Sequence, residues 1–256
     1  MGKNKLKKFA ELEKIESVFQ YPRERLIQEG FPHKGKWNSE VFGNNSPIVL
    51  ELGCGKGEYT VALAKSNSAA NYIGIDIKGA RLWSGAKEIE ESGIKNAAFL
   101  RTEIENICSF FSPDEISEIW ITFPDPQMQK TRKRLTSSRF LKLYGNILKP
   151  GGIIHLKTDS PFLYEYTRRL VNENGFEVIQ DTEDLYGEGK VDESTSIKTF
   201  YESQWLSRGK KIKYIAFRPD FSNELIEPKA DDIPKDDYRA YSRHTPISTK
   251  IKELES

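Results

Sequence analysis

Five short apolar segments alternate with longer amphipathic stretches in the middle of the chain. They are residues 48–52, 72–77, 97–100, 119–123 and 153–157. Each segment has the length of a buried strand, and their starts are separated by roughly 20 to 35 residues, as strand–helix–strand units require. The pattern predicts an α/β fold with a doubly wound, mostly parallel sheet and helices on both faces.

Two further strand-like segments, residues 176–180 and 212–217, follow Gly175. A polar stretch containing Gly187 and Gly189 separates them. Such a pair fits an antiparallel edge added to a parallel sheet. We therefore expect a seven-stranded, Rossmann-like sheet with an antiparallel edge strand.

The composition changes at both ends of this region. Residues 1–45 are irregular and interrupted by Pro and Gly, so we expect an N-terminal extension that precedes a catalytic domain at residues 46–218. Residues 219–256 lack glycine and contain scattered apolar residues, which predicts a C-terminal tail that is partly disordered or packs on the surface.

The overall composition excludes several classes of protein. The chain has 39 Lys and Arg against 38 Asp and Glu, so it has no general basic coat, although a local basic patch is compatible with this balance. Two cysteines cannot form a disulfide framework or a structural zinc site, and we expect no metal. No apolar run has membrane-spanning length, and the first residues lack a signal-peptide core. We expect a cytoplasmic enzyme or RNA-handling protein, either a monomer or a homodimer.

The first strand runs into a glycine-rich turn at Gly53, Gly55 and Gly57, with a helix expected from about Glu58. Glycines let the backbone approach a ligand closely and leave the N–H groups of the helix start available. A dinucleotide fingerprint would have glycine in place of Glu58, and Glu51 would repel a pyrophosphate. Glu51 instead suits a ligand with a positive ammonium or sulfonium group. The alternative is a structural turn with a capping acid.

The next two predicted strands also end in acids. Asp76 is placed to accept both hydroxyls of a ribose, and Glu103 to accept from an adenine amine. Either acid alone is equally compatible with an ordinary loop position. Because the carboxyl ends of parallel strands meet at one edge of a sheet, the acids together with Glu51 predict a site for a nucleoside cation.

These segments resemble the class I methyltransferases that use S-adenosylmethionine. The resemblance rests on the Glu-x-Gly-x-Gly-x-Gly turn, on the sequence Gly74-Ile75-Asp76, and on Lys149-Pro150-Gly151-Gly152 before the fifth strand. It implies S-adenosylmethionine as the cofactor.

The fourth strand leads into Phe123-Pro124-Asp125-Pro126. The two prolines restrict the backbone and hold the Asp125 carboxylate beside the strand end. A carboxylate there can accept from N1–H and the N2 amine of guanine together, which leaves N7 facing the methyl donor. A plain Asp-Pro turn is the alternative.

A basic segment follows at once. Residues 130–142 contain no acid and six basic side chains, namely Lys130, Arg132, Lys133, Arg134, Arg139 and Lys142. Such a run is often only a solvated face, but its position after the Asp125 segment favours phosphate contacts with a polyanion.

In combination, the Phe-Pro-Asp-Pro segment, the basic stretch, Thr158-Asp159 and Thr199-Phe200-Tyr201-Glu202 resemble the bacterial tRNA (guanine-N7)-methyltransferase family over roughly residues 46–217. The resemblance implies methyl transfer from S-adenosylmethionine to N7 of guanine 46 in the variable loop of tRNA. By position, it implies cofactor contacts by Glu51, Gly53, Gly55, Asp76, Glu103 and Asp125, with Asp125 also catalytic, and substrate contacts by Asp159, Thr199, Phe200, Tyr201 and Glu202. The loop after Asp125 departs from the family pattern, so the family's substrate-contacting lysine corresponds to Gln129 or Lys130.

Other interpretations remain open at this point. Asp159-Ser160-Pro161 and Thr199 to Glu202 both match helix-start patterns, so capping competes with substrate binding at each. At the level of function, the alternatives are a methyltransferase acting on another RNA, a small molecule or a protein, an NAD-dependent dehydrogenase, and a non-catalytic RNA-binding protein.

Overall fold

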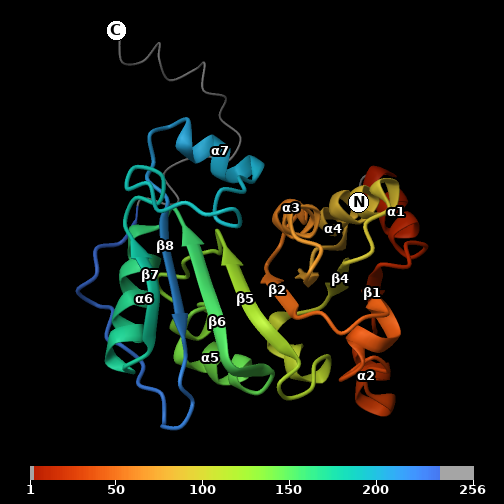
Figure 1. Cartoon of the computed structure of the whole chain (residues 1–256), viewed down its shortest axis with the longest axis horizontal. Coiled ribbons are helices and arrows are strands. Elements are labelled where there is room, and N and C mark those ends of the chain that lie inside the picture. The colour runs from red at the N-terminus through yellow and green to blue at the C-terminus, as the bar shows by residue number, and fades with distance from the viewer. Residues whose placement is uncertain (1–2, 237–256) are drawn as a thin grey trace, which may run out of the picture.

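Eight strands form one continuous sheet in the computed structural model, which describes residues 3–236 (Figure 1). The strands are β1 (Val18–Gln20), β2 (Ile48–Leu52), β3 (Asn71–Ile75), β4 (Ala97–Arg101), β5 (Ile116–Thr122), β6 (Leu148–Thr158), β7 (Glu177–Thr182) and β8 (Lys213–Arg218). Their order across the sheet is β1-β4-β3-β2-β5-β6-β8-β7. β8 is antiparallel to both of its neighbours, and the other neighbouring pairs are parallel.

Helices cover both faces of this sheet. They are α1 (Lys3–Leu12), α2 (Arg23–Glu29), α3 (Glu58–Ser66), α4 (Gly79–Ser92), α5 (Ser138–Gly145), α6 (Pro161–Glu173) and α7 (Phe200–Leu206), with short π or 3-10 segments η1 (Trp37–Phe42), η2 (Ile104–Ser109) and η3 (Thr131–Lys133). α3 and α4 pack against β3 and β4, whereas α5 and α6 pack on the opposite face against β6 and β8. Within residues 3–236, no helix combines the length and apolar character needed to cross a membrane.

The α/β prediction is confirmed, with two differences in detail. The sheet has eight strands, because the three-residue β1 pairs with β4 at the edge. The antiparallel strand β8 lies between β6 and β7, so the edge strand itself is β7. Figure 1 shows β5 and β6 pointing towards the end of the sheet where α7 lies, while β8 runs the opposite way.

Strand residues alternate between two apolar layers. In β2, Ile48, Leu50 and Leu52 pack into the layer that contains α5 and α6, whereas Val49 packs into the layer that contains α3 and α4. Successive strand side chains point to opposite faces, so Glu51 shares the face of Val49. A carboxylate therefore lies inside the α3 side of the sheet, close to its carboxyl end.

The segments before and after the predicted catalytic domain pack onto it within residues 3–236. Trp37 is fully buried in the core, and its indole N–H donates to the carbonyl of Phe110 at 3.0 Å. Near the other end, Ile233 is buried and the Asp236 carboxylate accepts from the hydroxyl of Ser160 and the backbone N–H of Phe162. The predicted tail thus packs on the surface as far as residue 236, and residues 237–256 lie outside the described residues. The domain limits at residues 46 and 218 remain a prediction.

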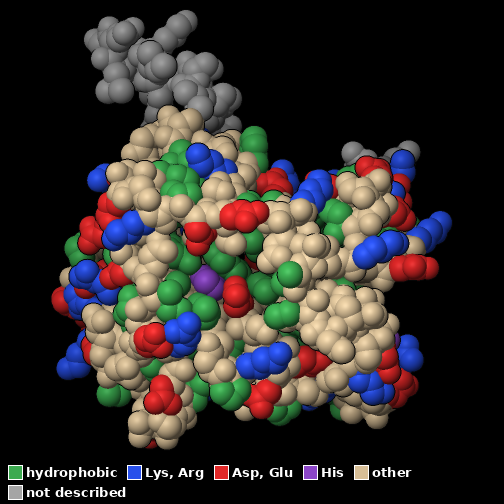
Figure 2. All heavy atoms as spheres, in the orientation of Figure 1, with side chains coloured by type: hydrophobic (Ala, Val, Ile, Leu, Met, Phe, Trp, Pro, Cys, Tyr) green, Lys and Arg blue, Asp and Glu red, His purple; other side chains and the backbone are tan. Residues whose placement is uncertain are grey.

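The surface carries charges of both signs. Figure 2 shows acidic and basic side chains intermixed over the face seen in Figure 1, consistent with a formal net charge of +1. Any recognition of a polyanion must therefore depend on local groups of basic side chains and not on a general positive field.

Candidate functional site

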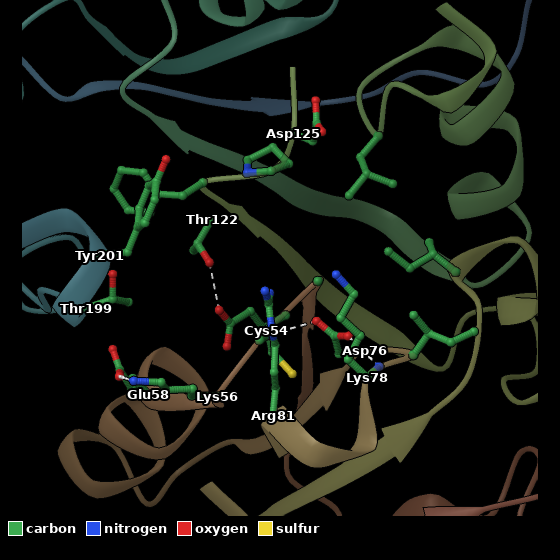
Figure 3. Close-up of a pocket in the computed structure, with 18 of the residues that line it drawn as sticks. Cys54, Lys56, Glu58, Asp76, Lys78, Arg81, Thr122, Asp125, Thr199 and Tyr201 are labelled. Atoms are coloured by element: carbon green, nitrogen blue, oxygen red, sulfur yellow. Dashed lines mark hydrogen bonds and ion pairs between the residues drawn. The ribbon is translucent and has the colours of Figure 1, made fainter. Parts of the chain in front are cut away.

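A cavity of about 820 Å³ opens at the carboxyl ends of the central strands (Figure 3). Its volume lies in the range of small-molecule and cofactor sites, roughly 300 to 1,000 Å³. Nine of the residues predicted to form the site line it: Glu51, Gly53, Gly55, Asp76, Glu103, Asp125, Thr199, Phe200 and Tyr201. The other four, Gln129, Lys130, Asp159 and Glu202, do not.

Glu51 is buried and lines the cavity. Its carboxylate accepts from the backbone N–H of Thr60 at 2.9 Å, from the Thr60 hydroxyl, and from the Thr122 hydroxyl at 2.7 Å. Burial raises the pKa of Glu51 to about 7, although the hydrogen bonds from Thr60 and Thr122 oppose the shift. The structure thus holds this acid in a fixed orientation. With a pKa of about 7, the neutral and ionised forms are both populated near neutral pH.

The neighbouring strand makes room for that arrangement. Gly74 on β3 pairs directly with Glu51, and a Cβ atom at Gly74 would lie 2.7 Å from the Thr60 hydroxyl oxygen. The same Cβ atom would lie 2.6 Å from the ring of Phe99, so a larger residue would have to displace Phe99, Thr60 or both. The glycine that the sequence pattern assigned to a strand therefore also serves the geometry of the site.

Asp76 organises the glycine-rich turn. One carboxylate oxygen accepts from the N–H of Gly55 at 3.0 Å, and the other accepts from the N–H of Lys78 at 2.7 Å. Gly53 and Gly55 both have positive φ values, of 75° and 59°, a conformation that side chains rarely adopt. The turn brings the backbone to the cavity wall beside the Asp76 carboxylate, where a ribose can be accommodated.

Asp125 lies at the rim, exposed to solvent, in a loop that we call the Asp125 loop (residues 123–128). One carboxylate oxygen accepts from the N–H of Gln127 at 3.0 Å. Phe123 and Gln127 both have a φ of 47°, in the left-handed region that costs a non-glycine residue about 1 kcal/mol or more. Two residues in this conformation, one on each side of Asp125, indicate that contacts with the surrounding protein maintain the backbone conformation of the loop.

The start of α7 forms the part of the cavity wall where Thr199 and Tyr201 lie in Figure 3. Thr199 caps this helix by accepting from the N–H of Glu202 at 3.1 Å, so the predicted capping role is confirmed. The N–H of Phe200 donates to the Glu58 carboxylate at 2.7 Å, which joins α7 to α3. Phe200 is 61% exposed, and the ring of Tyr201 meets Phe123 edge-on with centroids 5.6 Å apart. Aromatic side chains therefore border the cavity next to the Asp125 loop.

Glu202 lies inside the protein and does not line the cavity. It is fully buried and forms an ion pair with Lys157, also fully buried, at 2.9 Å. The Lys157 ammonium donates further to the carbonyls of Thr195 and Ile197, both at 2.8 Å. Burial lowers the pKa of Lys157, although the Glu202 carboxylate opposes this shift. In this structure, Glu202 anchors α7 and the segment before it, and the substrate contact assigned to Glu202 remains a prediction.

Asp159 also lies away from the cavity. It is buried at the end of β6, next to the start of α6, and burial raises its pKa to about 6. Ser160 is the N-cap of α6 and accepts from the N–H of Leu163 at 2.9 Å, which confirms the predicted helix start. The substrate contact assigned to Asp159 remains a prediction.

The basic segment is divided by the fold. Gln129, Lys130, Arg132 and Lys133 are exposed, and Lys133 lines the cavity and pairs with Glu105 at 3.2 Å. Arg134, in contrast, is 1% exposed. The interpretation of the run as one phosphate-binding face is therefore wrong for Arg134, because its guanidinium has no access to a bound polyanion.

Among the cavity residues that the sequence reasoning missed are three basic ones. Lys56, Lys78 and Arg81 line the cavity. Figure 3 shows Lys78 and Arg81 near Asp76, and Lys56 next to Glu58. The acids in the sequence indicated the cationic part of a ligand but gave no indication of an anionic part. S-adenosylmethionine has a carboxylate as well as a sulfonium. The carboxylate could have been used to predict basic residues in the site.

Three comparisons with known proteins bear on this site. A sequence profile described as "Putative methyltransferase" matches residues 45–215. The tRNA (guanine-N(7)-)-methyltransferase of Bacteroides thetaiotaomicron is 54% identical over 243 residues, covering 95% of this chain and 96% of that protein. The protein of the same name from Porphyromonas gingivalis is 56% identical over 238 residues, covering 91% of this chain and 96% of that protein.

Among solved structures, the 16S rRNA methyltransferase KamB aligns with a TM-score of 0.54 and 13% identity, covering 82% of this chain and 96% of that one. This likeness concerns the fold alone, which is that of a class I methyltransferase. With the two relatives aligned over nearly their entire length, the chain belongs to the tRNA (guanine-N7)-methyltransferase family.

Proposed function

We propose that this protein transfers the methyl group of S-adenosylmethionine to N7 of guanine 46 in the variable loop of tRNA, acting in the cytoplasm. The observation that carries the proposal is a single cavity lined by Glu51, Asp76, Glu103 and Asp125, in a chain of this family. The same observation counts against an NAD-dependent dehydrogenase, because Glu51 would face a pyrophosphate. It gives no reason to prefer a small molecule or protein substrate.

The residues present fit S-adenosylmethionine. The glycine turn and the Asp76 carboxylate suit a ribose, and Glu103 suits an adenine amine. Glu51 suits the positive end of the ligand, while Lys56, Lys78 and Arg81 suit its carboxylate. When bound, S-adenosylmethionine supplies an electrophilic methyl group.

Asp125 is proposed to hold the guanine. Its carboxylate accepts from N1–H and the N2 amine, which directs N7 towards the interior of the cavity. N7 carries a lone pair and no proton, so no side chain needs to act as a general base. Asp125 also offsets the positive charge that alkylation develops in the base, which is the electrostatic part of catalysis.

The remaining residues orient the base and exclude water. Tyr201 and Phe200 border the space beside the Asp125 loop, where a base that has left its stack can be received. Lys130, Arg132 and Lys133 are exposed next to that loop and suit the phosphates of the flanking nucleotides. Orientation of the two reacting atoms is the main contribution expected of the protein.

Incubation with unmodified tRNA and methyl-labelled S-adenosylmethionine tests the proposal. Nucleoside analysis of the product should show the label in 7-methylguanosine, and a matched transcript with adenine at position 46 should remain unlabelled. Label in another nucleoside, or in protein, would overturn the assignment. Full binding of tRNA and S-adenosylmethionine without any transfer would favour a non-catalytic RNA-binding protein.

A further inference from the structure

Arg134 contacts the Asp125 loop from inside the protein. Its Nε donates to the carbonyl of Pro126 at 3.2 Å, and one terminal nitrogen donates to the carbonyls of Gln127 at 3.1 Å and Met128 at 3.3 Å. One guanidinium therefore binds the carbonyls of the three residues that directly follow Asp125.

The charge of Arg134 is accommodated by aromatic rings. The guanidinium carbon lies 4.0 Å from the ring centroid of Tyr166 and 4.9 Å from that of Phe162, both on α6. The Tyr166 hydroxyl in turn donates to the Glu227 carboxylate of the C-terminal segment. Arg134 thus ties the Asp125 loop to α6, whose position the sheet fixes.

The loop needs such a restraint. Gln127 has a left-handed φ of 47°, and it is also the residue whose N–H donates to the Asp125 carboxylate at 3.0 Å. Arg134 fixes the carbonyl of the same residue. The contact therefore acts, through one residue, on the orientation of the Asp125 carboxylate.

We propose that Arg134 is a positioning residue for methyl transfer, which holds the Asp125 loop in the conformation that presents the carboxylate to the acceptor base. The proposal rests on the proposed function, because it assigns Arg134 an effect on the reaction through Asp125. It separates Arg134 from Arg132, which is two residues away but exposed. Arg134 acts on the protein backbone, whereas Arg132 is available to the substrate.

The test compares Arg134→Lys with the matched control Arg132→Lys. Lysine keeps the charge but has no planar fork that reaches three carbonyls at once. Hydrogen exchange of peptides covering residues 123–128 should become faster in Arg134→Lys and stay unchanged in Arg132→Lys. The single-turnover rate of Arg134→Lys should fall by about tenfold or more, because small displacements of a positioned group have large effects on rate. Its Kd for S-adenosylmethionine and its KM for tRNA should remain within about threefold of the wild-type values.

The possible outcomes are distinct. Wild-type exchange and rate in Arg134→Lys would overturn the proposal, and a raised KM for tRNA with an unchanged maximal rate would identify a substrate contact instead. If Arg134→Lys does not fold, Tyr166→Leu removes the ring beneath the guanidinium, and the same faster exchange and slower rate are expected. A wild-type protein that does not methylate guanine would overturn the proposed function and the catalytic half of this proposal, while the exchange comparison would still decide whether Arg134 restrains the loop.

Discussion

Glu51 combines complete burial with a position that suits a cation. A carboxylate surrounded by protein loses hydration, and burial raises its pKa to about 7. The three hydrogen bonds from Thr60 and Thr122 keep the group in place. A cationic ligand favours the ionised form, so ligand binding and proton release from Glu51 are coupled.

This coupling predicts a pH dependence of cofactor affinity. Glu51 becomes increasingly neutral as the pH falls below about 7. The Kd of the wild-type protein for S-adenosylmethionine should therefore rise by up to about tenfold for each pH unit below that value. Glu51→Gln should bind weakly, with a Kd that hardly changes between pH 5.5 and pH 8 (roughly the range that brackets such a pKa). Calorimetric titrations at several pH values provide the measurement. An equally pH-dependent Kd in Glu51→Gln would show that another group is responsible.

The same shift predicts an effect on stability. Because the folded-state pKa is raised from 4.5 to about 7, the contribution of Glu51 to stability is fully present below about pH 4.5 and is lost as the pH rises through 7. The total is about 3 kcal/mol. Urea unfolding without ligand measures the free energies of unfolding of Glu51→Gln and of the wild type. As the pH rises from 5 to 8, the value for Glu51→Gln should increase relative to that of the wild type by about 1 to 3 kcal/mol. A constant difference between the two proteins over that range would contradict the raised pKa.

At the scale of elements, the Lys157–Glu202 pair joins β6 to α7. Both side chains are fully buried, and the Tyr186 hydroxyl also donates to Glu202 at 2.6 Å. Removing one partner leaves an uncompensated charge buried inside the protein. The pair thus fixes the wall of the cavity that carries Thr199 and Tyr201.

Glu202→Gln and Lys157→Met should each lower the free energy of unfolding by about 3 to 5 kcal/mol. The double variant Lys157→Met/Glu202→Gln should be destabilised by less than the sum of the two single effects, because it leaves no single buried charge. Denaturant unfolding at neutral pH measures these values. The exposed pair Lys65–Glu88 is the matched control, and its disruption should cost less than about 1 kcal/mol. Additive effects at Lys157 and Glu202 would contradict the coupling.

These elements also show what local sequence can predict. The strands β2 to β8 and the start of α7 were predictable, because apolar strand segments and helix caps depend on residues at most four positions apart. The partner of Glu202 was not, because Lys157 is far away in sequence and only the fold brings them together. Arg134 looks like its exposed neighbours in the basic run, and its burial depends on the path of the Asp125 loop over α6. The strand Val18–Gln20 is too short to produce an alternating pattern.

At the scale of the whole molecule, binding of tRNA must rely on few basic groups, since the net charge is +1. Lys130 and Arg132 are exposed beside the Asp125 loop. Replacing both with alanine should raise the KM for tRNA and reduce the slope of log affinity against log salt by roughly 0.7 to 0.9 for each phosphate that the protein no longer neutralises. Binding titrations at several salt concentrations measure the slope. The control is Lys65→Ala, which should leave the slope unchanged. Lys65 lies in the last turn of α3, whereas the first residue of that helix, Glu58, lines the cavity. An unchanged slope in the double variant would show that these residues only solubilise the protein.

In the proposed function, one cavity assembled from separate strands holds the methyl donor with Glu51, Asp76 and Glu103 and the acceptor base with Asp125. The most direct test measures the Kd for S-adenosylmethionine and the single-turnover rate on unmodified tRNA for the same preparations of Asp76→Asn and Asp125→Ala. Asp76→Asn should raise the Kd for S-adenosylmethionine by about tenfold or more. At saturating S-adenosylmethionine, this variant should retain most of the wild-type single-turnover rate. Asp125→Ala should keep the Kd within about threefold and reduce the rate by about 100-fold or more. Methylation of tRNA by Asp125→Ala at close to the wild-type rate would show that Asp125 does not position the base.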